Sequence, residues 1–224
     1  MKQIAVIGLG RFGRRLASTL SANGAEVLAI DEDPAVVQEV SGEVASAVCL
    51  DSTDEEALRA VKVDQVDIAV VAIGEDIEAS ILTVSLLAEL NVPQIIARAV
   101  TPHQARILEK VGATRVVYPE DEVAVTLART LVSEHVLDYF TLSPHLHAVR
   151  MEAPEKFWGK TLAELHLRAR YGVSIVAIHR PTAPEEAQAI EINMPGGDQE
   201  IRKGDILVVL GAPQDIQRCE RENF

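Results

Sequence analysis

The sequence predicts a doubly wound α/β protein, in which helices cover both faces of a parallel six-stranded sheet, followed by a smaller α+β domain. Three observations predict it. Short apolar runs alternate with helical patterns six times, a glycine-rich turn follows the first run, and the alternation stops near residue 138. Strands that are apolar throughout are typical of a parallel sheet covered on both faces. The expected strand order is 3-2-1-4-5-6.

The glycine-rich turn follows the first strand, which we expect at residues 4–7. Gly8, Gly10 and Gly13 have the G-x-G-x-x-G spacing, and residues 14–20 predict an amphipathic helix. The first glycine permits a tight turn, the second lets the backbone approach a phosphate, and the third lets the helix pack on the strand. Because a helix N-terminus attracts phosphate, the segment predicts a Rossmann-type nucleotide site.

The second expected strand, residues 26–30, ends in Asp31. The carboxylate follows Gly13 at close to the spacing of about 20 residues that dinucleotide sites use, and there it would accept hydrogen bonds from both ribose hydroxyls. It would also repel a 2′-phosphate, which disfavours NADP. The alternative is that Asp31 caps the helix starting at Pro34, but Asp33 is better placed for that role.

The composition limits the class of protein. The chain has 224 residues, is 48% hydrophobic and 25% charged, and carries a net charge of −13, which argues against a protein that binds nucleic acid polymers or anionic lipid. No apolar run approaches the roughly 18 residues of a membrane span, and we expect no signal peptide. Two isolated cysteines, Cys49 and Cys219, favour a reducing cytoplasm.

The rest of the first domain follows the same alternation. The expected helices are 34–41, one starting at 54–56, 77–90, 102–110 (with Gly112 as its C-terminal cap) and 121 to about 137, and the expected strands are 45–50, 67–73, 94–97 and 114–118.

Residues 139–224 predict the second domain, and residues 1–138, including the long linking helix, the first. We expect strands at 147–151 and 205–210, an apolar segment at 173–179, a short helix holding Trp158 and residues 162–165, a polar proline-rich loop at 181–186, and a turn at 195–197.

Ligands bind such sheets beyond the carboxyl ends of the strands, where the strand order reverses. The candidate nucleotide-binding residues therefore lie in the loops at that edge. They are Gly8, Gly10, Arg11, Phe12, Gly13, Asp31, Glu32, Asp51, Ser52, Ala72, Ile73, Gly74 and Arg98.

Three charged residues at this edge each have two interpretations. Arg11 could bind a terminal phosphate of ATP or ADP, or it could pair with nearby carboxylates on the surface. The same alternatives apply to Arg98. Glu120, between the sixth strand and the long helix, would oppose phosphate binding unless a divalent cation lies between them, and from the residues alone it is a helix-start acid.

No catalytic constellation accompanies these residues. His135, His145 and His147 have no cysteine or carboxylate at ligand spacing, neither cysteine has a histidine at catalytic spacing, and no Ser/His/Asp arrangement is present. We therefore expect a protein that is not an enzyme.

The chain resembles the RCK (regulator of conductance of potassium) family, in particular the cytoplasmic regulatory subunits of Ktr/Trk potassium-uptake systems. The matching segments are residues 8–13, 27–31, 71–74, 77–83, 108–113 with Arg115, 118–120 and, in the second domain, 167–172. The resemblance extends over nearly the whole chain, and the Gly-Arg-Phe-Gly turn is its most specific part.

The resemblance implies a homodimer that assembles into an octameric ring beneath a membrane potassium-transporter subunit, peripheral at the inner face of the membrane and gated by ATP and ADP. Arg11 would reach the terminal phosphate of ATP in a neighbouring subunit, and Glu120 would bind Mg²⁺ or Ca²⁺ between facing ATP molecules. Some relatives bind cyclic di-AMP in the C-terminal domain, which implies a role for Arg168 or Arg170.

Two departures from the family keep NAD(H) open as a ligand, because relatives often have an amide at Asp51 and a lysine at Arg98. The alternatives are an NAD(H)-binding redox sensor or an NAD-dependent oxidoreductase, although the region after residue 140 is small for a substrate domain. A DNA-binding regulator would need a basic helix-turn-helix, and the chain has none.

Overall fold

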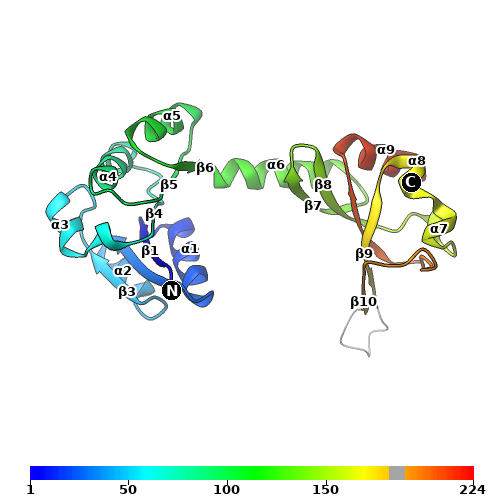
Figure 1. The fold of residues 1–224 in the computed structure, drawn as a ribbon, viewed down its shortest axis with the longest axis horizontal. Coiled ribbons are helices and arrows are strands. Elements are labelled where there is room, and N and C mark those ends of the chain that lie inside the picture. Colours follow the sequence, from blue (N-terminus) through cyan, green and yellow to red (C-terminus); the bar gives the residue numbers. More distant parts are fainter. Residues whose placement is uncertain (182–189) are drawn as a thin grey trace. The chain divides into compact units, whose positions relative to one another are not determined.

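The computed structural model describes residues 1–181 and 190–224, and it contains two packed units, residues 1–121 and 122–224 (Figure 1). The packing boundary falls inside a helix, α6 (Pro119–Val132). Within the described residues, no helix is both long and apolar enough to cross a membrane.

The first unit contains a six-stranded parallel sheet in the order β3-β2-β1-β4-β5-β6, which confirms the predicted topology. The strands are β1 (Gln3–Ile7), β2 (Glu26–Asp31), β3 (Ser46–Cys49), β4 (Ile68–Val71), β5 (Ile95–Arg98) and β6 (Arg115–Val117).

Helices cover both faces of this sheet, as Figure 1 shows. Alternate residues of β1 enter different cores: Ala5 and Ile7 pack with residues of α3, α4 and α5, whereas Ile4 and Val6 pack with residues of α1 and α2. The predicted doubly wound fold is therefore confirmed. The helices are α1 (Arg11–Ala22), α2 (Pro34–Val40), α3 (Glu55–Ala60), α4 (Ile77–Glu89) and α5 (Pro102–Val111), and a 3₁₀ turn, η1 (Val63–Gln65), follows α3.

The long helix differs from its predicted bounds of 121 to about 137. It begins at Pro119 and ends at Val132. A proline is accepted in the first turn because the backbone N–H that it lacks would have no partner inside the helix. The Ser133 hydroxyl accepts hydrogen bonds from the N–H groups of His135 (3.2 Å) and Val136 (2.9 Å), and the chain then enters a strand.

The second unit contains a five-stranded antiparallel sheet in the order β10-β9-β11-β8-β7. Of its elements, β7, β10 and the helices α8 and α9 were not predicted. The elements are β7 (Val136–Ser143), β8 (Leu146–Glu152), β9 (Ser174–Arg180), β10 (Ile190–Asn193), β11 (Ile206–Gly211), the 3₁₀ turn η2 (Glu155–Phe157), and the helices α7 (Leu162–Leu165), α8 (Leu167–Tyr171) and α9 (Pro213–Asn223).

Trp158 was wrongly predicted to lie in the same helix as residues 162–165. It follows η2 in extended backbone, and its indole N–H donates to the Ala153 carbonyl at 2.9 Å. The loop predicted at 181–186 lies outside the described residues except for Pro181.

A buried ion pair joins β9 to the turn before β11. The Asp205 side chain is fully buried, and its carboxylate accepts hydrogen bonds from Nε and Nη2 of Arg180 and from the Arg202 N–H, each at 2.8 Å. Breaking such a pair leaves an uncompensated charge in the interior.

We expect Asp205→Ala to lower the free energy of unfolding of the second unit by about 3–5 kcal/mol, because Arg180 loses its partner. Urea unfolding followed by the fluorescence of Trp158, the chain's single tryptophan, measures this. Asp138→Ala is the control, since Asp138 pairs with Arg150 while 44% exposed, and it should cost about 1 kcal/mol or less. Equal losses in both variants would contradict the prediction.

In the first unit, the start of α1 packs directly on the turn after β1. Gly8 has a φ of +88°, and a Cβ on Gly13 would lie 1.9 Å from the Gly8 carbonyl oxygen, too close for any side chain. Gly10 has open space around its Cβ position and a φ of −58°, which suits any residue. Only the third glycine of the turn is therefore required by packing of the helix on the strand.

Gly13→Ala should destabilise the first unit by at least about 2 kcal/mol, because the methyl group forces the helix away from the turn. Gly10→Ala should leave stability within about 0.5 kcal/mol. Calorimetric unfolding of the full chain compares the two variants. Comparable stability for Gly13→Ala and the unmodified chain would show that the helix shifts at no cost.

Candidate nucleotide-binding site

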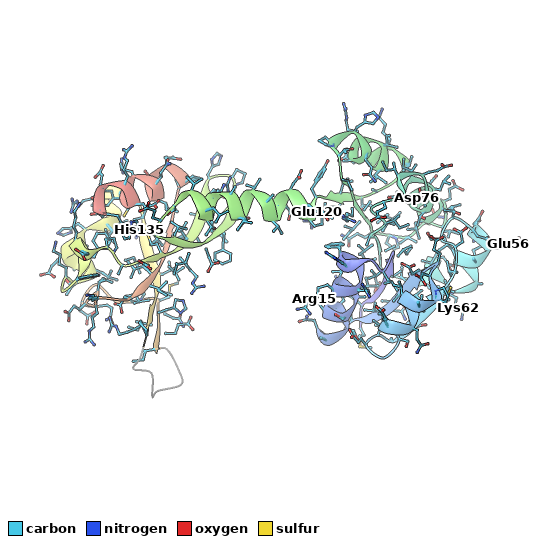
Figure 2. All side chains as sticks on the ribbon, turned by 180° about the vertical axis from the view of Figure 1, so that it is seen from behind. Arg15, Glu56, Lys62, Asp76, Glu120 and His135 are labelled. Carbon is cyan, nitrogen blue, oxygen red and sulfur yellow. The ribbon has the colours of Figure 1, made fainter. Side chains whose placement is uncertain are left out.

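A cavity of about 660 Å³ lies at the carboxyl ends of the strands in the first unit. Of the predicted residues, all but Gly13 line it, and Gly13 instead packs beneath the turn. Figure 2 labels two of its residues, Asp76 before α4 and Glu120 at the start of α6. The predicted residues on its walls are Gly8, Gly10, Arg11, Phe12, Asp31, Glu32, Asp51, Ser52, Ala72, Ile73, Gly74, Arg98 and Glu120.

Helix α1 begins at this cavity without a side-chain cap. Its N-cap residue is Gly10, and its first turn contains no acidic residue. Helices α2, α3, α4 and α5 are each capped, by Asp33, Asp54, Asp76 and Thr101. The first N–H groups of a helix have no partner inside the helix, so those of α1 are left for water or an anion in the cavity.

Asp31 is held in place at the cavity edge by the backbone. Its Oδ2 accepts a hydrogen bond from the Leu9 N–H at 2.6 Å, and its Oδ1 accepts one from the Asp33 N–H at 2.9 Å. Asp33, not Asp31, caps α2, by accepting from the Ala35 N–H at 2.8 Å, as predicted. Each Asp31 oxygen keeps a further lone pair that can accept from a hydroxyl of a ligand.

Arg98 and Glu120 form an ion pair that the sequence did not predict. Arg98 Nη2 donates to Glu120 Oε1 at 2.5 Å, and Arg98 Nε donates to Oε2 at 3.4 Å. The guanidinium lies against Gly74, where a Cβ would be 2.0 Å from Nη1. The hydrogen bond from Arg98 lowers the pKa of Glu120, so this carboxyl is ionised at neutral pH.

Arg11 lies on the rim of the cavity and forms no ion pair with any residue in the described parts of the chain. Its neighbour Arg14 pairs with Glu39 on α2. In the part of the chain that the structure describes, Arg11 therefore does not pair with local carboxylates, and the Arg11 guanidinium is available to a ligand.

The cavity is acidic. Six carboxylates line it, Asp31, Glu32, Asp51, Glu75, Asp76 and Glu120, against the two arginines, a formal charge of −4. Hydrogen bonds from the Thr53 hydroxyl and N–H lower the pKa of Asp51. A phosphate-rich ligand therefore needs the α1 N-terminus, the arginines or a cation to offset this charge.

Glu75 and Asp76 were missed as cavity residues. Asp76 could have been identified from the sequence, because aspartate is a preferred N-cap residue and Asp76 directly precedes the helix expected at Ile77. In the structure it caps this helix by accepting a hydrogen bond from the Ala79 N–H at 2.9 Å. The cap places this carboxylate at the end of β4, beside the predicted residues 72–74.

Two of the histidines considered as metal ligands, His135 and His147, contact aromatic side chains. The His135 ring, labelled in Figure 2 beside α9, stacks on Phe224 with centroids 3.7 Å apart, and His147 Nδ1 is hydrogen-bonded to the Tyr139 hydroxyl. In residues 1–181 and 190–224, no three His, Cys, Asp or Glu side chains are close enough together to hold a metal ion. Arg168 and Arg170 lie on α8, and their role in binding cyclic di-AMP stays a prediction.

Comparison with known proteins identifies both parts of the chain. The TrkA-N domain family matches residues 4–119, and the TrkA-C domain family matches residues 146–222. Ktr system potassium uptake protein C of Bacillus subtilis is 41% identical over 220 residues, which cover 98% of this chain and 96% of that protein. Ktr system potassium uptake protein A of the same organism is 37% identical, with 100% and 97% covered.

Solved structures agree with the sequence relatives. The GsuK channel is 26% identical with a TM-score of 0.53, over 98% of this chain, and the GsuK channel bound to NAD is 25% identical with the same TM-score. This chain spans 38% of the length of either GsuK chain. The resemblance predicted from the Gly-Arg-Phe-Gly turn is confirmed, and the chain belongs to the RCK family, with the TrkA-N and TrkA-C domains of the Ktr potassium uptake proteins.

Proposed function

We propose that this chain is a nucleotide-sensing regulatory subunit of a Ktr/Trk-type potassium-uptake system, a binding protein rather than an enzyme, whose cavity takes ATP or ADP. The observation that carries the proposal is the uncapped start of α1 facing a cavity that also holds Asp31 and Arg11, which forms no ion pair with any residue that the structure describes. Its relatives of nearly equal length, the Ktr system potassium uptake proteins, support the potassium-uptake assignment.

Under this proposal, the parts of the nucleotide would follow the strand order along the sheet edge. Phosphates would lie at the N-terminus of α1, after β1, and the ribose would lie at Asp31, at the end of β2. The next strand outward is β3, so the base would lie against Leu50, Asp51 and Ser52, which follow it on the cavity wall.

The ion pair between Arg98 and Glu120 suggests how phosphates would be sensed. A terminal phosphate near Arg98 would compete with Glu120 for the guanidinium, and the displaced Glu120 carboxylate would then be open to water or a cation. A divalent cation, Mg²⁺ or Ca²⁺, held by Glu120 and phosphate oxygens would supply positive charge in a cavity of formal charge −4.

Helix α6 supports the assembly part of the proposal, a homodimer that builds an octameric ring. The helix has no buried residue, and five large apolar side chains on it are at least half exposed: Val123, Val125, Leu127, Leu131 and Val132. Such a surface is typical of an interface. The ring would dock at the cytoplasmic side on a membrane transporter subunit, and coupling of roughly 1–3 kcal/mol between nucleotide and ring shape would suffice for control.

NAD(H) is the second candidate ligand, and an NAD(H)-binding redox sensor the second candidate function. The specific support is the GsuK structure bound to NAD. The carboxylate of Asp31 suits the ribose of either ligand, so only binding data separate them.

Calorimetric titration of the full chain with ATP, ADP, NAD⁺ and NADH, with and without Mg²⁺, tests the proposal. Tight binding of ATP and ADP with weak binding of NAD⁺ supports nucleotide sensing. A preference for NADH that is independent of Mg²⁺ favours the redox sensor, and turnover of NAD⁺ with any substrate would contradict the assignment as a binding protein.

We expect Arg11→Ala to weaken ATP binding about tenfold or more and ADP binding much less, because only ATP presents a γ-phosphate. Titration of the assembled protein with both nucleotides measures this. Arg15→Ala is the control, since Arg15, labelled in Figure 2, lies one turn further along α1 and does not line the cavity. Equal loss for both nucleotides would show that Arg11 does not read the γ-phosphate.

Glu120→Gln should remove the dependence of ATP binding on Mg²⁺ or Ca²⁺, because an amide keeps the size but not the charge that holds the cation. The measurement is the ATP dissociation constant as a function of cation concentration. Glu122→Gln, on the same helix and outside the cavity lining, serves as the control. An unchanged cation dependence in Glu120→Gln would place the cation elsewhere.

A further inference from the structure

The residues that follow β3 form one wall of the cavity, and a pair of buried hydroxyl groups lies at this wall. Ser52 contributes to this wall, and its Oγ lies 2.8 Å from Oγ1 of Thr83, a residue of α4 with no exposed surface. Thr83 does not line the cavity. It therefore acts on a ligand only through Ser52.

The distance between the two hydroxyls allows either to donate, and only one arrangement of the protons makes this bond and the bond to the Ser52 carbonyl at the same time. The Thr83 hydroxyl donates its single proton to the backbone carbonyl of Ser52 at 3.3 Å, and a carbonyl can only accept. The bond between the two hydroxyls is then made by the proton of Ser52, with Thr83 Oγ1 as acceptor. In this arrangement Ser52 Oγ has no proton left to donate to a ligand.

The neighbouring polar group on this wall also accepts hydrogen bonds. Asp51 Oδ1 accepts from the Thr53 N–H at 2.8 Å and from the Thr53 hydroxyl at 2.7 Å, and these bonds lower the pKa of the Asp51 carboxyl. An ionised carboxylate has no proton to donate. The side chains of Asp51 and Ser52 thus present acceptors alone.

We propose that Thr83 is a positioning residue for nucleotide specificity. By accepting the Ser52 proton, Thr83 leaves only hydrogen-bond acceptors on the side chains of this wall. The wall therefore selects a base with an exocyclic amine, such as adenine, over a base with a carbonyl at the same position. The inference rests on the proposed function, because it takes the base of a bound nucleotide to lie at this wall. A base carbonyl placed against these two side chains finds no proton donor on either of them.

The test compares ADP with inosine 5′-diphosphate, which has a carbonyl in place of the amine of adenine. Titration of the unmodified full chain should show ADP binding about tenfold or more tightly. In Thr83→Val the Ser52 proton loses its acceptor and can turn to the cavity, so the preference for ADP should fall to about threefold or less. Thr83→Ser, which restores the oxygen, should restore the preference.

Ser80→Ala is the matched control. Ser80 lies one turn before Thr83 on α4 and is equally buried, and within the described residues its hydroxyl makes no hydrogen bond. This variant should keep the preference for ADP. If Thr83→Val does not fold, Thr83→Ala removes the same oxygen without adding a methyl group and gives the same comparison.

The possible outcomes are distinguishable. A loss of affinity that is equal for the two diphosphates in the Thr83 variants would mean that Thr83 is merely structural and would overturn the inference, as would an equal loss of preference in Ser80→Ala. An unmodified chain that binds neither diphosphate would overturn the proposed function as well. A preference that is lost in Thr83→Val and regained in Thr83→Ser supports the inference.

Discussion

The close contact of Gly13 with the Gly8 carbonyl is the constraint on which the candidate site depends. It fixes the first turn of α1 against the end of β1, with no room for a side chain between them. Because Gly10 is the N-cap and offers no side chain, the N–H groups of that turn face the cavity without a partner from a cap. The other four helices of the first unit's sheet begin with a capping side chain, so this one helix start is left for a ligand.

The parallel half of the fold could be predicted from the sequence because each strand is an apolar run bounded by turn residues. The second half could not be predicted as well. Residues 132–137 have a helical apolar pattern, yet hydrogen bonds to the Ser133 hydroxyl and the pairing of β7 with β8 direct them into a strand. The last helix was missed although Pro213 marks its first turn.

In the candidate site, too, some residues could be predicted from the sequence and others could not. Residues at strand ends, such as Asp31 and Asp51, could be placed from topology alone, since parallel strands bring their carboxyl ends to one edge. The pair of Arg98 with Glu120 could not, because it depends on where two long side chains meet across separate elements. The sequence also did not single out Thr83, which we propose as a positioning residue, since a buried threonine on an apolar helix has the pattern of a core residue.

The acidity of the cavity gives the Arg98–Glu120 pair its significance. Arg98 is one of two cations among the eight charged residues that line it, so a phosphate bound near Arg98 would compete with Glu120 for the guanidinium. Glu120 lies in the first turn of α6, and the same helix continues into the second packed unit. Under the proposed function, a ligand with one more phosphate would change the partner of a residue on the helix that spans the boundary between the two units. A ligand controls a protein only through such a difference in interaction between two states, and we propose that this pair supplies one.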